Sequence, residues 1–475
     1  MTSRTFTMKD QHDFAALSGD FNPLHVDPIG ARRLIFGSPV VHGVHLLLWA
    51  LEIGLKSPVR LHTLTVGFNA PVRVGDQVSC SATLENGTAQ LQLYVDAVKV
   101  GSVECTYLPL TRRGAVTSGL PPHGRCREIE RSALPAAAGT VELMVDEAVL
   151  GASFPRLNQV LPVDQIAILL GSTRLIGMEC PGLHSLYSGL NLTFDEPANG
   201  GSSLSWQVRH FDERFARLSI EVAGCGARGT LVAFVRPRTV AQPSYVAIRE
   251  AVAPGAYCGE RALVVGGSRG MGEVCAKLLA AGGAEVRLTY ARGLEDAARV
   301  VAEIVEGKGR AAAASLDVLN PPADLSTVLG DRWVPTHLYF FATPLIQVGT
   351  GLFSARLFAD YSSYYVDAFL RLVYAVRALA PDGLAVFYPS TVFVDEMPRD
   401  FAEYALAKAA GEAACRFLSC NDPGLSVLVE RFPRVSTDQT AALLAKQTLD
   451  PIAPLVGILD SPSLRSARTV ASERR

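Results

Sequence analysis

Residues 39–76 read PVVHGVHLLLWALEIGLKSPVRLHTLTVGFNAPVRVGD and combine a long apolar stretch with the start of a strand-like region. The apolar stretch lies between Pro39 and Pro58. It predicts a helix, because prolines commonly stand at a helix start and beyond its end. Alternating runs follow, such as QLQLYVDAVKVGSVECTYL (90–108), which predict antiparallel strands. This part of the chain therefore favours an α+β unit.

The same order of features recurs further along the chain. Pro162 and Pro181 enclose a second apolar stretch, and LHSLYSGLNLTFDEPANGG (183–201) follows it. The run RLSIEVAGCGARGTLVAFV (217–235) again has strand-like alternation. We interpret the two regions as an internal repeat of one helix plus several antiparallel strands.

The last part of the chain alternates strand and helix. ALVVGG, EVRLTY and AAAASLDV predict strands, and GMGEVCAKLLAAG and LEDAARVVAEIVEGKG predict helices between them. HLYFFAT, LAVFYPS and LSVLVERF supply later strands. This alternation is typical of an α/β Rossmann domain with a doubly wound parallel sheet.

Composition limits the class of protein. The 475 residues favour several domains, and stretches rich in proline and glycine at 112–138 and 236–257 predict linkers. They leave expected domains at 1–111, 139–235 and 258–462. The net charge of −2 gives no electrostatic reason to bind nucleic acid. The nine cysteines show no metal-ligand spacing, so we expect no metal site. No apolar run is long enough for membrane insertion, and a cytoplasmic protein is expected.

A first candidate site lies in SGDFNPLHVDP (18–28), where Asp20 and His25 share a short stretch with Pro23. Proline fixes its own φ and biases Asn22 towards an extended backbone, so the stretch predicts a rigid loop. A neutral imidazole can accept a proton from water that a carboxylate orients, and the pair can also protonate a leaving hydroxyl. Gly43 falls in the first turn of the predicted helix, where an unpaired N–H could donate to a thioester carbonyl as it becomes enolate-like.

SGDFNPLHVDP, ARRLIFGSPVVHG (31–43) and FNAPVRVGD (68–76) together resemble the MaoC-type (R)-specific enoyl-CoA hydratases of the hot-dog fold. The resemblance implies that Asp20 and His25 activate water and that Gly43 supplies an oxyanion N–H. Asn22 would brace the loop. The second repeat lacks the Asp–His pair and a glycine matching Gly43. It is therefore expected to be a degenerate partner and pure scaffold, giving a double hot dog with one site.

A second candidate site begins at LVVGGSRGMG (263–272), where a strand enters a glycine-rich turn that opens a helix. Such a turn binds a pyrophosphate at the helix N-terminus. Arg269 and Arg292 flank the expected ribose position, and no acidic residue ends the second strand, so we predict NADPH rather than NADH. The residues expected to bind this cofactor are Gly266, Ser268, Arg269, Gly270, Met271, Gly272, Arg292, Asp317, Val318, Tyr404 and Lys408.

YPSTVFVDEMPRDFAEYALAK (388–408) places Tyr404 and Lys408 on one face of a predicted helix. The lysine charge can lower the pKa of Tyr404, which can then protonate a carbonyl. Ser390 could polarise that carbonyl. The region resembles the 3-ketoacyl-thioester reductases of the short-chain dehydrogenase/reductase family, which implies that Ser390, Tyr404 and Lys408 form the catalytic trio.

The same resemblance implies that Asp317 and Val318 contact adenine. Several positions depart from the family pattern. FFATP (340–344) replaces the usual strand end, Asp367 stands where an asparagine is usual, and Arg434 where a small residue is usual. Asp367 could hold a water or pair with Lys408.

Both resemblances fit one reaction sequence, and a bifunctional enzyme is the leading hypothesis. It would reduce 3-ketoacyl thioesters with NADPH and dehydrate the (R)-3-hydroxyacyl product. Substrates would be acyl-CoA or acyl-carrier-protein thioesters, and a homo-oligomer is expected. Three alternatives stay open: a hydratase with an inert reductase-like domain, an acyl-thioester or carrier-protein binding scaffold, and a reductase acting on an unrelated carbonyl compound.

Overall fold

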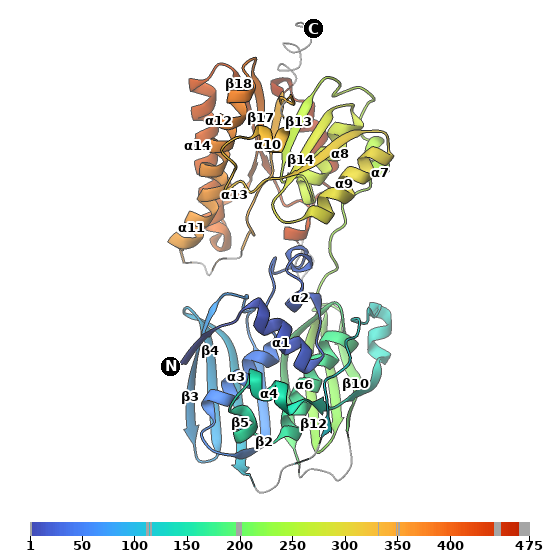
Figure 1. Cartoon of the computed structure of the whole chain (residues 1–475), viewed down its shortest axis with the longest axis vertical. Coiled ribbons are helices and arrows are strands. Elements are labelled where there is room, and N and C mark those ends of the chain that lie inside the picture. Colours follow the sequence, from blue (N-terminus) through green and yellow to red (C-terminus); the bar gives the residue numbers. More distant parts are fainter. Residues whose placement is uncertain are drawn as a thin grey trace. The chain divides into compact units, whose positions relative to one another are not determined.

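The computed structural model describes residues 2–110, 114, 116–195, 202–330, 332–347, 349, 352–440 and 448–464. The chain divides into two compact units, and the division falls after Thr239 (Figure 1). Each unit has its own hydrophobic core.

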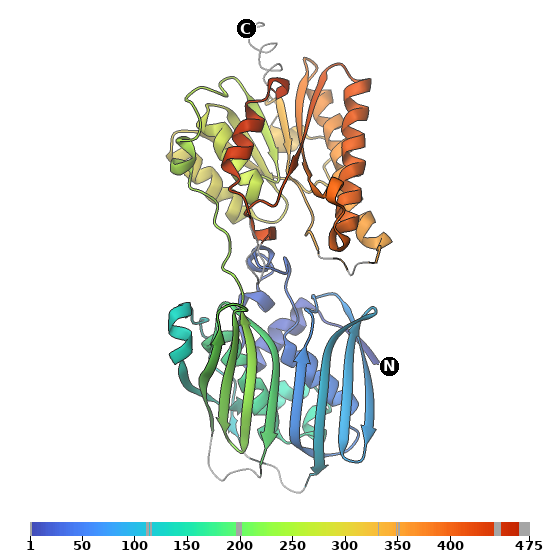
Figure 2. The ribbon, with the colours of Figure 1, turned by 180° about the vertical axis from the view of Figure 1, so that it is seen from behind.

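The first unit is built on one antiparallel ten-stranded sheet (Figure 2). In spatial order the strands are β1 (Thr2–Thr5), β3 (Gln77–Glu85), β4 (Thr88–Val95), β5 (Val98–Pro109), β2 (Val59–Phe68), β9 (Ser185–Phe194), β12 (Ala227–Val235), β11 (Arg217–Gly224), β10 (Ser203–Asp212) and β7 (Ala138–Glu142). The second five strands repeat the first five in mirrored order. The predicted repeat is therefore visible in the strand order, and the fold class, a double hot dog, is confirmed.

Two central helices, α3 (Gly43–Gly54) and α6 (Val163–Arg174), pack on one face of this sheet (Figure 1). The two halves join where β2 pairs with β9, with Leu64 opposite Leu192 and Val66 opposite Leu190. Both helices are shorter than their flanking prolines suggest. After α6 the chain continues as a π-helical turn, Leu175–Glu179. The apolar face of each helix and the inner face of the sheet form one continuous core.

Shorter elements surround this core. They are α1 (Met8–Ser18), α2 (Pro23–Val26), η1 (Gly30–Arg33), β6 (Thr117–Ser118), η2 (Arg131–Ala136), β8 (Met144–Val145), α4 (Glu147–Ser153) and α5 (Leu157–Val160). The first predicted linker, 112–138, packs against the first unit where it is described, since Leu134 in η2 is fully buried.

The second unit contains a parallel six-stranded sheet, which confirms the doubly wound fold class. The spatial order is β15 (Arg310–Ser315), β14 (Glu285–Tyr290), β13 (Arg261–Val265), β16 (His337–Phe340), β17 (Leu384–Thr391) and β18 (Leu425–Phe432). From β13 to β15 the chain adds strands towards one edge of the sheet, and from β16 to β18 it adds them towards the other edge. In such sheets, ligands bind beyond the carboxyl ends of the strands at this switch point.

Helices cover both faces of the parallel sheet (Figures 1 and 2). One core includes α8 (Gly270–Ala281), α9 (Leu294–Glu306), α15 (Ile452–Leu459) and α7 (Tyr245–Arg249). The other includes α10 (Ser326–Leu329), α11 (Ala355–Ser362), the π-helical η4 (Ser363–Ala368), α12 (Phe369–Leu379) and α14 (Ala402–Asn421). The remaining short helices are α13 (Phe393–Glu396), η5 (Arg399–Phe401) and η6 (Asp438–Thr440).

The second predicted linker, 236–257, is only partly a linker. Tyr245 and Tyr257 are buried in the core of the second unit, and the Lys277 ammonium donates to the Pro243 carbonyl at 3.0 Å. The polypeptide from about Pro243 onward is therefore part of that unit.

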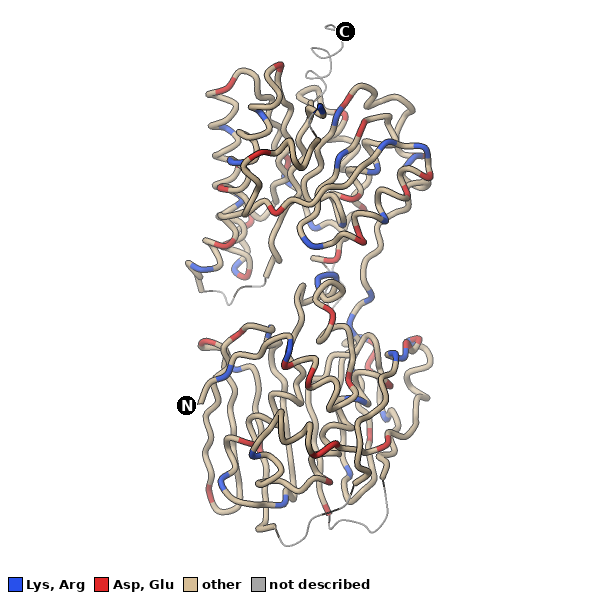
Figure 3. The backbone as a smooth tube through the Cα atoms, viewed as in Figure 1, with Lys and Arg blue, Asp and Glu red and all other residues tan. Residues whose placement is uncertain are grey.

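Basic and acidic residues are interspersed along the backbone of both units (Figure 3). Within the described residues, no helix has the length and apolar character needed to cross a membrane.

Candidate active sites

The loop that carries Asp20 and His25 is held by short, local caps. Helix α1 ends at Gly19, whose φ of 76° is unfavourable for other residues. Asn22 caps the single-turn helix α2, where its side-chain oxygen accepts from the Leu24 N–H at 3.1 Å and Pro23 fills the first position. The predicted rigid loop thus contains one helical turn, and His25 lies within it.

The Asn22 amide also ties this loop to the second repeat. Its Nδ2 donates to the carbonyls of Gly177 and Gly182, each at 3.1 Å. Asn22 is fully buried. Its expected bracing role is consistent with these contacts.

Asp20 is buried, with 2% of its surface exposed. Its Oδ2 accepts from the Thr173 hydroxyl at 2.6 Å, and its Oδ1 accepts from the Asn22 N–H at 3.2 Å. Burial raises the pKa of Asp20, while the nearby His25 and the hydrogen bonds from Thr173 and Asn22 partly offset that rise.

His25 is partly exposed, and its Nδ1 lies 2.8 Å from the Val40 carbonyl oxygen. A carbonyl only accepts, so Nδ1 carries the proton in this contact and Nε2 keeps its lone pair. Burial lowers the pKa of His25, against the opposing effect of Asp20. A carboxylate and a neutral imidazole nitrogen arranged in this way can handle one water or hydroxyl together.

His42, which sequence analysis did not select, completes a cluster with the predicted pair. Its ring stacks on His25 with centroids 3.8 Å apart, and its Nε2 lies 3.0 Å from the Asp20 carbonyl. Candidate metal-ligand atoms of Asp20, His25 and His42 lie within 4.8 Å of one another. However, the His42 Nδ1 also faces the Gln11 amide oxygen at 3.1 Å. Both His42 nitrogens therefore have protein partners, which disfavours a metal ligand there.

Gly43 is the first residue of α3, directly after His42. A β-carbon at this position would lie 2.9 Å from the Phe68 ring. Helix N-termini present N–H groups without an internal partner. Gly43, the predicted N–H donor, therefore follows directly after His42, which contacts both Asp20 and His25.

The second repeat contributes directly to this site, so the prediction that it is pure scaffold is wrong. Thr173 in α6 donates to Asp20, and Gly177 in the following π-helical turn lies against the same carboxylate. The absence of an Asp–His pair in the second repeat led to the wrong inference. A hydroxyl donor and a glycine carry no motif that would reveal them.

The segment after the first repeat also reaches this site. The His123 ring lies 4.0 Å from the Phe21 ring, and Cys126 Sγ lies 3.4 Å from Met178 Sδ. Asp20 contributes to the raised pKa of Cys126, which burial dominates. This part of the predicted linker 112–138 therefore lies beside the loop that carries Asp20.

In the second unit, the glycine-rich turn has the geometry that the cofactor prediction requires. Gly266 and Gly270 have φ of 78° and 57°, and a β-carbon on Gly272 would lie 2.3 Å from the Gly266 carbonyl oxygen. Ser268 and Arg269 directly precede α8, and Met271 lies in its first turn. A β-carbon on Gly266 would meet the backbone of Ala342 at 2.9 Å. The turn and the FFATP segment therefore meet at the switch point, which fits a nucleotide.

The other residues predicted to bind the cofactor lie at the same end of the sheet. Arg292 and Asp317 are exposed, and Val318 is buried. Burial raises the pKa of Tyr364, Asp317 raises it further, and Arg292 lowers it. Asp317 also accepts from the Leu319 N–H at 3.0 Å. An exposed guanidinium near the end of β14 fits a phosphate-bearing ribose.

The structure brings Thr391, rather than Ser390, to Tyr404. The Tyr404 hydroxyl hydrogen-bonds with the Thr391 side chain, and burial raises the pKa of Tyr404. The Ser390 hydroxyl instead donates to the Glu412 carboxylate at 2.5 Å. Successive strand residues point to opposite faces, so only one of the two can face Tyr404. The expectation that Ser390 acts with Tyr404 is corrected accordingly.

Lys408 is enclosed by aromatic rings. Its ammonium donates to the Pro389 carbonyl at 2.7 Å and lies 3.9 Å from the centre of the Tyr365 ring. Burial lowers the pKa of Lys408 to about 7. Asp367 is exposed whereas Lys408 is buried, so the pairing with Lys408, one of the two roles considered for Asp367, gains no support from the structure. From this helix it is Tyr365 that contacts the lysine.

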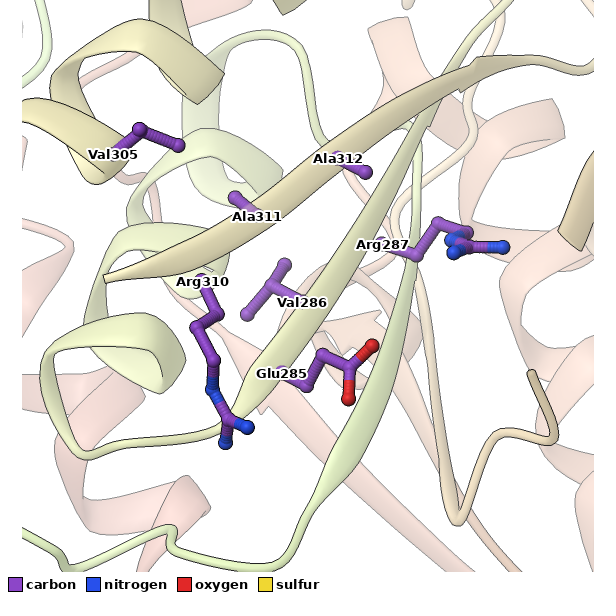
Figure 4. Close-up of a pocket in the computed structure, with 7 residues that line it drawn as sticks. All are labelled: Glu285, Val286, Arg287, Val305, Arg310, Ala311 and Ala312. Atoms are coloured by element: carbon purple, nitrogen blue, oxygen red, sulfur yellow. The ribbon is translucent and has the colours of Figure 1, made fainter. Parts of the chain in front are cut away.

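A separate hollow of about 400 Å³ lies at the β14–β15 edge of the parallel sheet (Figure 4). It is lined by Glu285, Val286, Arg287, Val305, Arg310, Ala311 and Ala312. None of the residues predicted to act in catalysis or cofactor binding lines it. It therefore gives no support to either candidate site.

Comparisons with known proteins match both units. Residues 1–104 match the family described as MaoC like domain, and residues 260–330 match short chain dehydrogenase. Over 84 residues the chain is 42% identical to the (R)-specific enoyl-CoA hydratase of Aeromonas caviae, covering 16% of this chain and 60% of that protein. It is 36% identical over 98 residues to Protein MaoC of Klebsiella aerogenes, covering 20% and 29%. The chain thus spans less than two thirds of either relative.

Among solved structures, the chain resembles angucycline C-6 ketoreductase LanV with bound NADP, at 24% identity and a TM-score of 0.39. The match covers 45% of this chain and 93% of that one. By these matches, residues 1–104 are similar to the MaoC like domain and residues 260–330 are similar to short chain dehydrogenase.

Proposed function

We propose that the chain is a bifunctional enzyme acting on acyl thioesters. The second unit reduces a 3-ketoacyl thioester with NADPH, and the first unit removes water from the (R)-3-hydroxyacyl product or adds it to the enoyl thioester. The observation that carries this proposal is the buried Asp20 carboxylate, fixed by Thr173 and Asn22 beside a His25 ring whose Nδ1 contacts the Val40 carbonyl. It is supported by the family matches to both units.

In the dehydration direction, a base removes a proton from the carbon next to the thioester carbonyl, and the hydroxyl leaves with a proton. His25 Nε2 and Asp20 handle these protons. The Gly43 N–H donates to the carbonyl oxygen as negative charge develops there. Thr173 and Asn22 keep the Asp20 carboxylate in one orientation, which is the precondition for proton transfer at a fixed distance.

In the reduction, bound NADPH would supply a hydride to the ketone carbon. The Tyr404 hydroxyl donates a proton to the ketone oxygen, and Thr391 holds that hydroxyl in place. The Lys408 charge lowers the cost of the tyrosinate that remains. Gly266, Gly270 and Gly272 would admit the pyrophosphate of this cofactor, and Arg269 and Arg292 would favour its 2′-phosphate.

A second candidate function is favoured by the enclosure of Lys408. Its ammonium contacts Pro389, Tyr365 and Tyr388, whereas Asp367 is exposed. This arrangement would suit a unit that binds a nucleotide but reduces ketones slowly. The chain would then be a hydratase with a reductase-like domain.

One experiment separates the two candidates. Short and medium 3-ketoacyl-CoA substrates are incubated with the full chain and NADPH, and the acyl products are identified by mass spectrometry. An enoyl product formed through a hydroxy intermediate is the expected result. An untouched ketone, with added enoyl-CoA still hydrated, would remove the reductase assignment and leave the hydratase.

A further inference from the structure

Arg236, directly after β12, is a buried arginine with no acidic partner within the part of the chain that the structure describes. Only 2% of its surface is exposed, and among the described residues it forms no ion pair. Its Nη2 donates to the Leu183 carbonyl, and its Nε has no hydrogen-bond partner. Buried charges in proteins are normally paired, because leaving one unpaired is costly.

This guanidinium lies beside the candidate hydratase site. The Leu183 carbonyl that accepts from Arg236 also lies 3.4 Å from the Asn22 amide nitrogen. Asn22 in turn donates its backbone N–H to Asp20. The positive charge of Arg236 acts on both His25 and Cys126. The Leu183 carbonyl thus contacts both the Arg236 guanidinium and Asn22, which belongs to the loop that carries Asp20 and His25.

The position of this charge is unfavourable for the proposed chemistry at His25. A cation near His25 disfavours the protonated ring that a leaving hydroxyl requires. Neutralisation of Arg236 on substrate binding would remove that penalty. The neutralising group must be an anion that arrives with the substrate, since the described residues offer no carboxylate to pair with Arg236.

We propose that Arg236 binds a carboxylate carried by the acyl chain of the thioester, so that the hydratase unit prefers dicarboxylic acyl substrates. The inference rests on the proposed hydratase function and specifies its substrate class. A guanidinium and a carboxylate can form paired, charge-assisted hydrogen bonds, which give orientation as well as affinity. The phosphates of coenzyme A offer the same chemistry, but the pantetheine arm keeps them far from the reacting carbons.

The test compares glutaconyl-CoA with crotonyl-CoA, which lacks the terminal carboxylate. The full chain is expected to hydrate glutaconyl-CoA with the higher kcat/KM. Arg236→Gln is expected to lower that value about 10- to 100-fold, the effect typical of a lost hydrogen bond to a charged group. Hydration of crotonyl-CoA should be unchanged or improved. Arg236→Lys should retain part of the preference, and Arg238→Gln, at an exposed arginine paired with Glu128 and Glu130, should retain all of it.

Binding of the saturated analogues glutaryl-CoA and butyryl-CoA, measured by calorimetry, tests the same inference without turnover. Loss of the glutaryl-CoA preference in Arg236→Gln, with an unchanged melting temperature, supports it. Equal losses for both thioesters, or a lower melting temperature, would mean that Arg236 is structural. If Arg236→Gln weakens crotonyl-CoA but not crotonyl-pantetheine, the anion is a phosphate and the proposal is overturned. Failure to hydrate any enoyl thioester would instead contradict the proposed function.

Discussion

Gly177 lies directly against the carboxylate of Asp20: a β-carbon on Gly177 would stand 2.1 Å from Asp20 Oδ1. The two residues belong to different repeats, and both are buried. The π-helical turn that contains Gly177 thus forms one wall of the site whose proposed catalytic groups come from the first repeat.

Gly177→Ala should therefore displace Asp20. We expect enoyl-CoA hydration to fall by about 10²-fold or more, because positioned acid–base groups contribute about 10²–10⁴-fold. The matched control is Gly151→Ala in α4, where an added β-carbon meets nothing within 4 Å. Loss of the enoyl absorbance gives the rate. Equal rates for the two variants would contradict this account of the site.

Thr173→Val removes the hydrogen bond that opposes the raised pKa of Asp20. The pKa of Asp20 should rise further, so the acidic limb of the hydration rate should move to higher pH. The pKa of Asp20 is higher in the folded chain than in the unfolded chain. The free energy of unfolding therefore falls as pH rises between these two pKa values, and Thr173→Val should make this fall larger. Thr173→Ser, which keeps the hydroxyl, should restore the wild-type pH profile. A profile that is the same in all three proteins would exclude the hydrogen bond as its cause.

Thr391→Val should impair ketone reduction more than Ser390→Ala, since Thr391 contacts the Tyr404 hydroxyl and Ser390 contacts Glu412. We expect a loss of about 10- to 100-fold for Thr391→Val, as for one lost hydrogen bond near a developing charge. Tyr404→Phe gives the fully inactive reference. NADPH oxidation with a 3-ketoacyl-CoA measures all three. The reverse order of Thr391→Val and Ser390→Ala would assign the role to the serine.

The pKa of Lys408, lowered to about 7, predicts an alkaline loss of reductase activity. The lysine assists Tyr404 only while it is charged, so kcat/KM should fall as pH rises above about 7. Stability should change in the opposite sense. Between about pH 7 and the unfolded lysine pKa the unfolded chain binds more protons, so the free energy of unfolding should rise with pH. Lys408→Met should abolish both dependences. A flat rate profile from pH 6 to 9 would show that the lysine does not titrate there.

Arg292→Ala should weaken NADPH binding and leave NADH binding nearly unchanged. A guanidinium on a 2′-phosphate contributes charge-assisted hydrogen bonds, so we expect an increase of roughly 10- to 100-fold in the Kd for NADPH. Cofactor fluorescence measures both constants. Arg310→Ala, at the distant end of β15, serves as the control. Wild-type protein that binds NADH as tightly as NADPH would contradict the predicted cofactor preference.

Local sequence patterns were enough to predict the fold class and the location of the loops. Proline punctuation marked both central helices, and the glycine turn before α8 predicted the nucleotide end of the parallel sheet. Spacing along the chain also selected Asp20 with His25 and Tyr404 with Lys408, because the members of each pair are close in sequence.

Contacts between distant segments were not predictable in this way. Thr173 lies far from Asp20 in the sequence and has no motif, and Arg236 was assigned to a linker. Ser390 and Thr391 are adjacent in one strand, so only the direction of each side chain distinguishes them. Asp367 was selected for its position along a helix, but the π-helical turn Ser363–Ala368 changes which side chains face the core, and Tyr365 reaches Lys408 instead.

The pairing of β2 with β9 also determines how the first unit responds to dilution. Two separate copies of one repeat would have to associate to complete such a sheet, and their assembly would depend on concentration. Here the partner strand is tethered to the same polypeptide, so its effective concentration is fixed by the intervening chain. The contacts between Thr173 and Asp20 consequently persist in a single molecule, however dilute the protein becomes.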